Sequence, residues 1–206
     1  MDPDTTQIAF GLGRIAAALR AAQWQAATEV GLVPAQAEIL TRIARHPMRP
    51  AEIAAHLGVS AASASDSIST LVAKGLAERR PDPTDGRAQL LVPTARGAEL
   101  AASLSDASSP LDDALASLAG VDRAGLSHAL TLLIRGLQDA KAIPVQRMCA
   151  TCRHFRPRVH ADPERPHHCE FVNAAFGDAS LRLDCGEHEP ASPDIAADHW
   201  RRFRAA

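Results

Sequence analysis

All four cysteines of this 206-residue chain lie in one short window, after 148 residues that contain none. Their spacing is Cys149-x2-Cys152-x16-Cys169-x15-Cys185. Cysteine thiolates bind zinc and iron–sulfur clusters, and the turn of a C-x2-C pair brings two sulfurs to one centre. Because the chain has no secretory signal, clustered thiols indicate a metal site more than disulfides. These four cysteines are therefore the candidate metal ligands.

Three interpretations of the cysteines stay open. A zinc ribbon would take its third and fourth ligands from a second C-x2-C pair, whereas Cys169 and Cys185 stand alone. A histidine could replace one of them on zinc, and the nearby candidates are His154, His160, His167, His168 and His188. An iron–sulfur cluster suits four separated thiolates, because its corners are spread in space. Unligated or redox-active thiols are the third interpretation, although a C-x-x-C oxidoreductase needs a βαβ pattern that is absent.

The composition favours a mainly α-helical protein. Hydrophobic residues make up 46% of the chain, and many are Ala or Leu, which are strong helix formers. The formal net charge of −2 means that any surface for nucleic acid must be local. No apolar run reaches the roughly 20 residues that span a bilayer, and "MDPDTTQIAF" lacks the basic start of a signal peptide. We therefore expect a cytoplasmic protein with no membrane partner.

Apolar spacing and capping residues predict four helices in the first 75 residues. The expected ranges are 5–30, 34–46, 50–58 and 61–74. The first helix carries an apolar stripe formed by Ile8, Leu12, Ile15, Leu19 and Trp24. Gly58 ends the third helix and Ser60 caps the fourth, so these two helices form a helix-turn-helix.

The pattern then changes to that of a β-hairpin. Residues 76–80 and 88–92 are expected to be strands, around a tip that contains Pro81, Pro83, Asp85 and Gly86. A hairpin directly after a helix-turn-helix is a wing. A long helix is expected from Thr94, with a break near 108–110, and another over 122–141 with a wide leucine stripe.

These elements resemble the MarR family of winged helix-turn-helix transcription regulators over the first 141 residues. The resemblance is carried by "LVPAQAEILTRIARHP" and "AEIAAHLGVSAASASDSISTLVAKGLAERRPDPTDGRAQLLVPTARG". It implies a homodimer, joined through the first and last helices, that binds a near-palindromic double-stranded DNA operator and usually represses. It does not extend to the cysteines.

The local charge agrees with a DNA-binding surface. Residues 42–96 hold eight Lys or Arg against five Asp or Glu, a balance of +3. The candidate DNA-binding residues are Ser60, Ser63, Ser65, Asp66, Lys74, Arg80, Asp85 and Arg87. The resemblance implies that Arg87 enters the minor groove, with its guanidinium oriented by Asp85. Asp66 repels phosphate but can accept a hydrogen bond from cytosine N4.

A change of composition near 143–144 marks the expected domain boundary. Residues 1–142 form the DNA-binding and dimerisation domain, and residues 143–206 form a small, irregular Cys/His-rich metal module. The pattern "CATCRHF…HHCEF…DCGEHEP" resembles the cluster-binding region of high-potential iron–sulfur proteins. That resemblance implies a 4Fe–4S cluster held by the four cysteines, and zinc is the alternative cofactor. A segment with so little apolar material would stay folded mainly through its metal.

Together these observations predict a DNA-binding regulator whose cysteine centre senses redox or iron state. One alternative keeps the regulator but gives it a structural zinc and a small organic acid or phenol as effector. Another is an electron-transfer or thiol-redox protein in which the winged domain is only a scaffold. No enzyme is expected, because the chain has no P-loop, no nucleotide-binding glycine pattern and no recognisable nucleophile–base pair.

Overall fold

A computed structural model describes residues 2–106 and 110–205 of the chain. The fold is mainly helical, with 58% of residues in helices and two small antiparallel sheets, which confirms the expected fold class. The chain divides into two compact units, Met1–Ala116 and Ser117–Ala206. The sequence predicts a boundary at 142–143 from the change of composition, and that boundary stays a prediction. No helix in the described ranges is long and apolar enough to cross a membrane.

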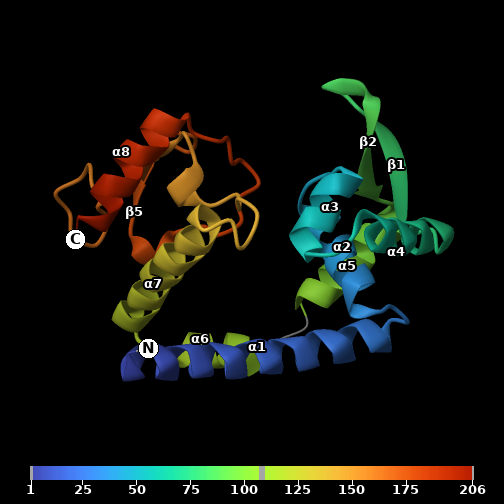
Figure 1. The fold of residues 1–206 in the computed structure, drawn as a ribbon, viewed down its shortest axis with the longest axis horizontal. Helices are drawn as coiled ribbons and strands as arrows, with labels where there is room; N and C mark the ends of the chain where they lie inside the picture. The colour runs from blue at the N-terminus through green and yellow to red at the C-terminus, as the bar shows by residue number, and fades with distance from the viewer. Residues whose placement is uncertain (1, 107–109, 206) are drawn as a thin grey trace. The chain divides into compact units, whose positions relative to one another are not determined.

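The first unit has the order of a winged helix-turn-helix. Helices α2, α3, α4 and α5 gather at the base of the hairpin β1–β2, which projects from them (Figure 1). The elements are α1 (Pro3–Glu29), α2 (Pro34–Arg45), α3 (Pro50–Leu57), α4 (Ala61–Ala73), β1 (Ala77–Asp82), β2 (Asp85–Pro93), α5 (Ala95–Asp106) and α6 (Pro110–Ser117), which ends at the first residue of the second unit.

Local signals set the helix-turn-helix. Helix α3 ends at Gly58, whose φ of +65° lies in the left-handed region that glycine tolerates best. Ser60 then caps α4, because its side-chain oxygen accepts a hydrogen bond from the backbone N–H of Ser63. The buried face of α4 consists of Ala64, Ile68 and Leu71, as its spacing predicts. These residues pack with Ile39, Leu40 and Ile43 of α2, which places the core directly beneath α4.

The wing is longer and its turn is tighter than the sequence predicts. Strand β1 continues through Pro81 to Asp82, and β2 already begins at Asp85. Pro81 and Pro83 indicate an earlier end of the strand, because proline cannot donate a backbone hydrogen bond. Each strand of a two-stranded ribbon has an open edge, where proline is tolerated. The Asp82 carboxylate closes the turn by accepting hydrogen bonds from the backbone N–H and the hydroxyl of Thr84, at 2.8 and 2.7 Å.

Helix α5 ends at Asp106 and α6 begins at Pro110. Of the break expected near 108–110, residues 108 and 109 lie outside the described residues. Helix α1 exposes much of its apolar stripe within its own unit. Ile8, Leu12, Ile15 and Trp24 are all exposed, and so is Phe10. Single exposed apolar residues are ordinary, whereas a continuous row along one helix indicates a surface that another molecule covers.

The second unit combines a long helix with the cysteine-bearing segment. Its elements are α7 (Gly120–Asp139), η1 (Cys149–Thr151), β3 (Phe155–Arg156), β4 (His167–Cys169), β5 (Ala174–Phe176), η2 (Asp178–Ser180) and α8 (Pro193–Arg204). Strands β3, β4 and β5 form one antiparallel sheet in that order. Cys152, Phe155, Leu181 and Phe203 form a small core, with Leu132 of α7 packed against it.

Helix α8 is not predicted from the sequence. It is strongly charged, and the residues that it buries are His199 and Phe203, one turn apart. Two buried positions do not make a periodic pattern, because the remaining face of the helix contacts water. Residues 143–205 therefore have more regular structure than their composition indicates.

Gly97, in the first turn of α5, gives a test of the packing in the first unit. A Cβ added there would lie 1.8 Å from the Leu76 carbonyl oxygen, so Gly97→Ala must displace α5 from the backbone just before β1. We expect the free energy of unfolding to fall by about 1–3 kcal/mol, measured by urea denaturation. Gly125→Ala on α7 is the matched control, because a Cβ there meets nothing within 4 Å. An unchanged midpoint for Gly97→Ala would contradict this packing.

Candidate nucleic-acid interface and cysteine cavity

Helix α4 and the wing expose the whole set of candidate DNA-binding residues. Ser60, Ser63, Ser65 and Asp66 are exposed at and after the start of α4. The hydroxyls of Ser60 and Ser63 lie 3.0 Å apart and bond to each other, so they form one polar group at the helix start. Serine hydroxyls both donate and accept, which suits them to phosphates and to base edges.

Two of the predicted basic contacts are already engaged within the protein. The Lys74 ammonium donates to the Gly31 carbonyl oxygen at 2.7 Å, beyond the C-terminal end of α1. The Arg80 guanidinium pairs with Glu78 on the same strand, with Nε 2.8 Å from Oε1. Both residues are exposed, and an ion pair at an exposed site exchanges readily with water or phosphate. Their roles on DNA stay predictions.

Asp85 does not orient Arg87 in the way the sequence suggests. Its carboxylate accepts a hydrogen bond from the backbone N–H of Arg87 at 3.1 Å. The guanidinium close to the Asp85 carboxylate is that of Arg49, whose Nη1 lies 3.9 Å from Oδ2. Arg87 is exposed on β2 close to the turn of the wing. Asp85 therefore shapes the backbone of the wing at Arg87.

Arg49 and Asp82 hold the wing against the helix-turn-helix, and neither is in the predicted site. Arg49 Nη2 and Nε lie 2.6 and 2.8 Å from the same Asp82 oxygen. Met48 and Leu91 pair beside them through two backbone hydrogen bonds. Charge-assisted bonds of this kind fix direction as well as distance. The 33-residue separation between Arg49 and Asp82 gives no local signal, so the pair could not be found from spacing.

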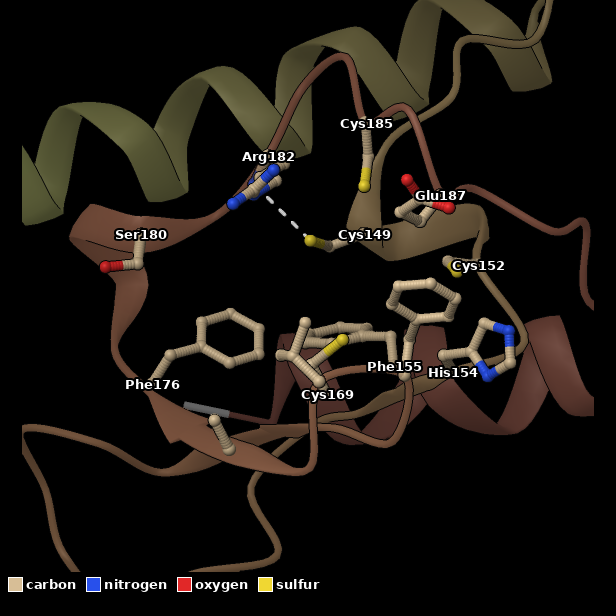
Figure 2. A pocket seen from close by; sticks show the side chains of 13 residues that line it. Cys149, Cys152, His154, Phe155, Cys169, Phe176, Ser180, Arg182, Cys185 and Glu187 are labelled. Atoms are coloured by element: carbon tan, nitrogen blue, oxygen red, sulfur yellow. Dashed lines mark hydrogen bonds between the residues drawn. The ribbon is translucent and has the colours of Figure 1, made fainter.

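All four cysteines line one cavity of about 180 Å³ in the second unit. Figure 2 shows Cys149 and Cys185 on one side of it, Cys169 on the opposite side and Cys152 beside His154. The rest of the lining is mainly apolar and includes Phe155 and Phe176. The chain thus brings together every cysteine that the sequence predicts to act as a ligand.

Long-range backbone pairing sets these positions. The Cys149 N–H donates to the Arg182 carbonyl oxygen at 2.9 Å, and the Cys185 N–H donates to that of Arg147 at 2.8 Å. The two segments therefore run side by side and bring Cys185 to Cys149. Cys169 is placed by β4, where it pairs with Phe155 of β3.

The cavity disfavours an isolated thiolate at Cys149. Burial raises the pKa of the Cys149 thiol to about 11, and the three other cysteines add to that rise. The Arg182 backbone N–H donates to Cys149 Sγ at 3.3 Å and opposes the rise. Within residues 2–106 and 110–205, no group of three His, Cys, Asp or Glu side chains is arranged to hold a single metal ion. The ligand role of the four cysteines stays a prediction.

Of the candidate histidines, His154 lines the cavity. Its Nε2 also lies 3.1 Å from a carboxylate oxygen of Glu189. The other four make contacts with polar groups elsewhere in the unit. His160 contacts His168 at 3.2 Å, His188 contacts the Thr151 hydroxyl at 2.9 Å, and His167 contacts Asp178 at 2.7 Å.

Residues 30–88 match the MarR family model; this segment holds α2, α3, α4 and most of the wing. Solved structures that share this fold include the following three. The transcriptional regulator SlyA is 21% identical, with 65% of this chain and 95% of that chain covered and a TM-score of 0.55. A MarR transcriptional regulator from Methanosarcina mazei Go1 is 17% identical, with 66% and 99% covered and a TM-score of 0.56. A MarR family transcriptional regulator from Listeria monocytogenes, complexed with 26mer DNA, is 22% identical, with 63% and 88% covered and a TM-score of 0.55.

At these identities the likeness establishes a winged helix fold of the MarR type. Each alignment leaves about a third of this chain without a counterpart. No curated protein matches the chain.

Asp82 gives a pH-dependent test of the wing. Its hydrogen bonds from Thr84, and then the Arg49 guanidinium, lower the carboxyl pKa from the ordinary 3.8 to about 2. A pKa that is lower in the folded state stabilises the fold fully above the unfolded value. This contribution is therefore lost as the pH falls from 3.8 through about 2.

We expect that Asp82→Asn removes this part of the acid destabilisation, as measured by urea unfolding at a series of pH values. Asp66→Asn, which changes an exposed carboxylate of α4, controls for net charge. An acid slope unchanged by Asp82→Asn would show that the carboxylate does not stabilise the wing.

Proposed function

We propose that this chain is a dimeric, sequence-specific DNA-binding transcription regulator, and that its cysteine cavity holds an inorganic centre whose redox or iron state controls DNA binding. One observation carries the DNA-binding part. A serine-lined helix and an arginine-bearing wing are exposed together in the one segment that matches the MarR family model.

The interface suits duplex DNA. Helix α4 rests on a buried core and presents Ser63, Ser65 and Asp66 outward, as a helix that enters the major groove must. Arg87 lies on a narrow hairpin that can follow the backbone into the minor groove. The solved Listeria monocytogenes relative carries a 26mer DNA, which supports the same activity for this fold.

Exposed apolar rows support a homodimer. The row on α1 is described above, and α7 exposes Val121, Leu126, Leu133 and Leu137. Rows of this kind on long helices cost free energy in water and are covered in a symmetric dimer. A two-fold axis would present two copies of α4, whose separation must match half-sites about 34 Å apart.

The cavity supports an iron–sulfur cluster more than zinc. A zinc ion with bonds of about 2.3 Å draws four sulfurs around a single point. Here four cysteines from separate segments surround a cavity of about 180 Å³ with an apolar lining. A cubane cluster fills such a space, because its thiolate ligands attach at four corners. Its positive core would also favour the thiolate form of Cys149, whose pKa is raised by burial. We infer that zinc is the less suitable occupant.

An alternative effector site is offered by a separate cleft of about 270 Å³ in the first unit. It is lined by residues of α1, α2 and α5, among them Gln23, Arg42 and Arg45. Two arginines beside apolar residues suit a small organic acid or phenol. Regulation by such a ligand would operate with a static metal centre in the second unit.

The DNA interface is tested by Arg87→Ala. Loss of this arginine should weaken binding to the promoter upstream of the protein's own coding sequence about 10- to 100-fold, or about 1–3 kcal/mol. Arg201→Ala on the exposed face of α8 removes the same charge outside the helix-turn-helix and should leave affinity within about twofold. Fluorescence anisotropy at fixed salt measures both. Equal loss in the two variants would mean that only net charge matters.

The inorganic centre is tested on protein purified without oxygen. We expect a visible absorbance band and roughly four iron and four sulfide per chain. Cys169→Ser should lower both, whereas Ser180→Ala, which also alters the cavity lining, should retain them. Colourless protein with one zinc per chain would contradict the cluster. Equal promoter affinity before and after removal of the iron would contradict the sensing role.

A further inference from the structure

Asp178 lies between two imidazole rings that come from different parts of the second unit. Its Oδ1 is 2.7 Å from Nε2 of His167 on β4, and its Oδ2 is 3.2 Å from Nδ1 of His128 on α7. His128 is 39 positions before His167 and 50 before Asp178, so only the tertiary fold brings it to them. One carboxylate therefore joins the long helix to the cysteine-bearing segment.

The contact with His167 has a defined direction. The Arg158 backbone N–H donates to His167 Nδ1 at 3.2 Å, so the ring proton must lie on Nε2 and is donated to Asp178. His167 is fully buried, and burial lowers its pKa, which keeps the ring neutral. Phe155, Phe176 and Phe203 surround it with ring centroids 5.3 to 5.6 Å away. The ring cannot turn without breaking both bonds.

The contact with His128 is electrostatic in character. Nδ1 of His128 is buried and makes no hydrogen bond of good geometry within the described part of the chain. The neighbouring Asp178 oxygen gives this polar atom a charged partner. The ring also stacks on Phe203 with centroids 4.7 Å apart, so His128 is held in place on α7.

The residues that Asp178 joins also build the cavity. Cys169 follows His167 by two positions on β4. Ser180 and Arg182 follow Asp178 and line the cavity, and the Arg182 N–H reaches Cys149 Sγ. Displacing Cys169 would therefore move His167, and displacing Cys149 would move the segment that carries Asp178.

Helix α7 has a second contact near the cavity. The Gln138 side-chain N–H donates to Met148 Sδ at 3.2 Å, and both residues are buried. Met148 directly precedes Cys149. His128 and Gln138 are ten residues apart, which is about 15 Å along the helix. The helix is thus attached near both Cys169 and Cys149.

We propose that Asp178 is the positioning residue that couples the cysteine centre to α7. With the centre bound, β4 and the segment after η2 are held together through Cys169 and Cys149, and Asp178 fixes His128 and hence α7. When the centre is lost, these segments separate and the carboxylate must leave one imidazole for water. Helix α7 then shifts, and with it the exposed leucines that serve the dimer. This inference rests on the proposed function.

The test is Asp178→Asn in the full-length protein, assembled with its centre under anaerobic conditions. Asparagine keeps the shape and can still accept from His167, but it removes the charge beside His128. Promoter affinity is measured with the centre intact and after its removal by an iron chelator. We expect the wild-type affinities to differ about tenfold or more, and those of Asp178→Asn, with its iron retained, to differ by no more than about twofold.

Asp162→Asn is the matched control. Asp162 interacts with Glu164 and Arg165 within its own turn, so this variant should keep the wild-type affinity ratio. Amide hydrogen exchange in α7 is the second measurement. It should increase in the wild type when iron is removed, and it should already be high in iron-loaded Asp178→Asn.

The outcomes separate this inference from the proposed function. Equal affinities in the wild type, with and without iron, would overturn the sensing role itself. A wild-type ratio that persists in iron-loaded Asp178→Asn would overturn only the role of Asp178. If Asp178→Asn loses iron, the coupling is tested with His128→Phe instead. This variant leaves Asp178 and His167 in contact and keeps an aromatic ring stacked on Phe203. A lost ratio in that variant supports the coupling, and a retained ratio overturns it.

Discussion

The gathering of four cysteines around one mainly apolar cavity is the constraint on which our account of the second unit depends. Cys149, Cys152, Cys169 and Cys185 face a mainly apolar cavity, where an ionised sulfur has little water and few donors to stabilise it. The Arg182 N–H is one such donor and does not offset burial at Cys149. The positively charged occupant that we propose would offset this cost at Cys149. The same occupant would also tie together four segments whose shared core is small.

The first unit holds exposed polar residues at fixed positions. Part of its positive charge is used for this purpose. Arg49 anchors the wing through Asp82, and Lys74 is bonded to the Gly31 carbonyl oxygen at the end of α1. A count of basic residues therefore overstates the charge that is available to phosphates. Arg87 is exposed and bonds to Asp85 through its backbone N–H, so its guanidinium remains the clearest candidate for contact with DNA.

Helix α7 carries apolar residues of two kinds. Leu132 packs into the small core beside the cysteines, whereas Leu126, Leu133 and Leu137 are exposed. A rigid helix transmits a displacement along its length, since its backbone hydrogen bonds resist bending. Contacts at His128 and Gln138 thus give the cavity a mechanical connection to the proposed dimer surface.

The sequence by itself determined the helices and turns of the first unit, because their signals lie within a few residues of each other. The cap at Ser60, the left-handed Gly58 and the spacing of Ala64, Ile68 and Leu71 are all local. Tertiary structure alone decided the Arg49–Asp82 pair, the position of Asp178 between two histidines and the burial of His199 and Phe203 on α8. Each of these depends on segments distant in sequence that meet only when the core closes. The cysteine spacing indicated a shared centre, but the backbone pairing of 147–149 with 182–185 set the size and lining of the cavity.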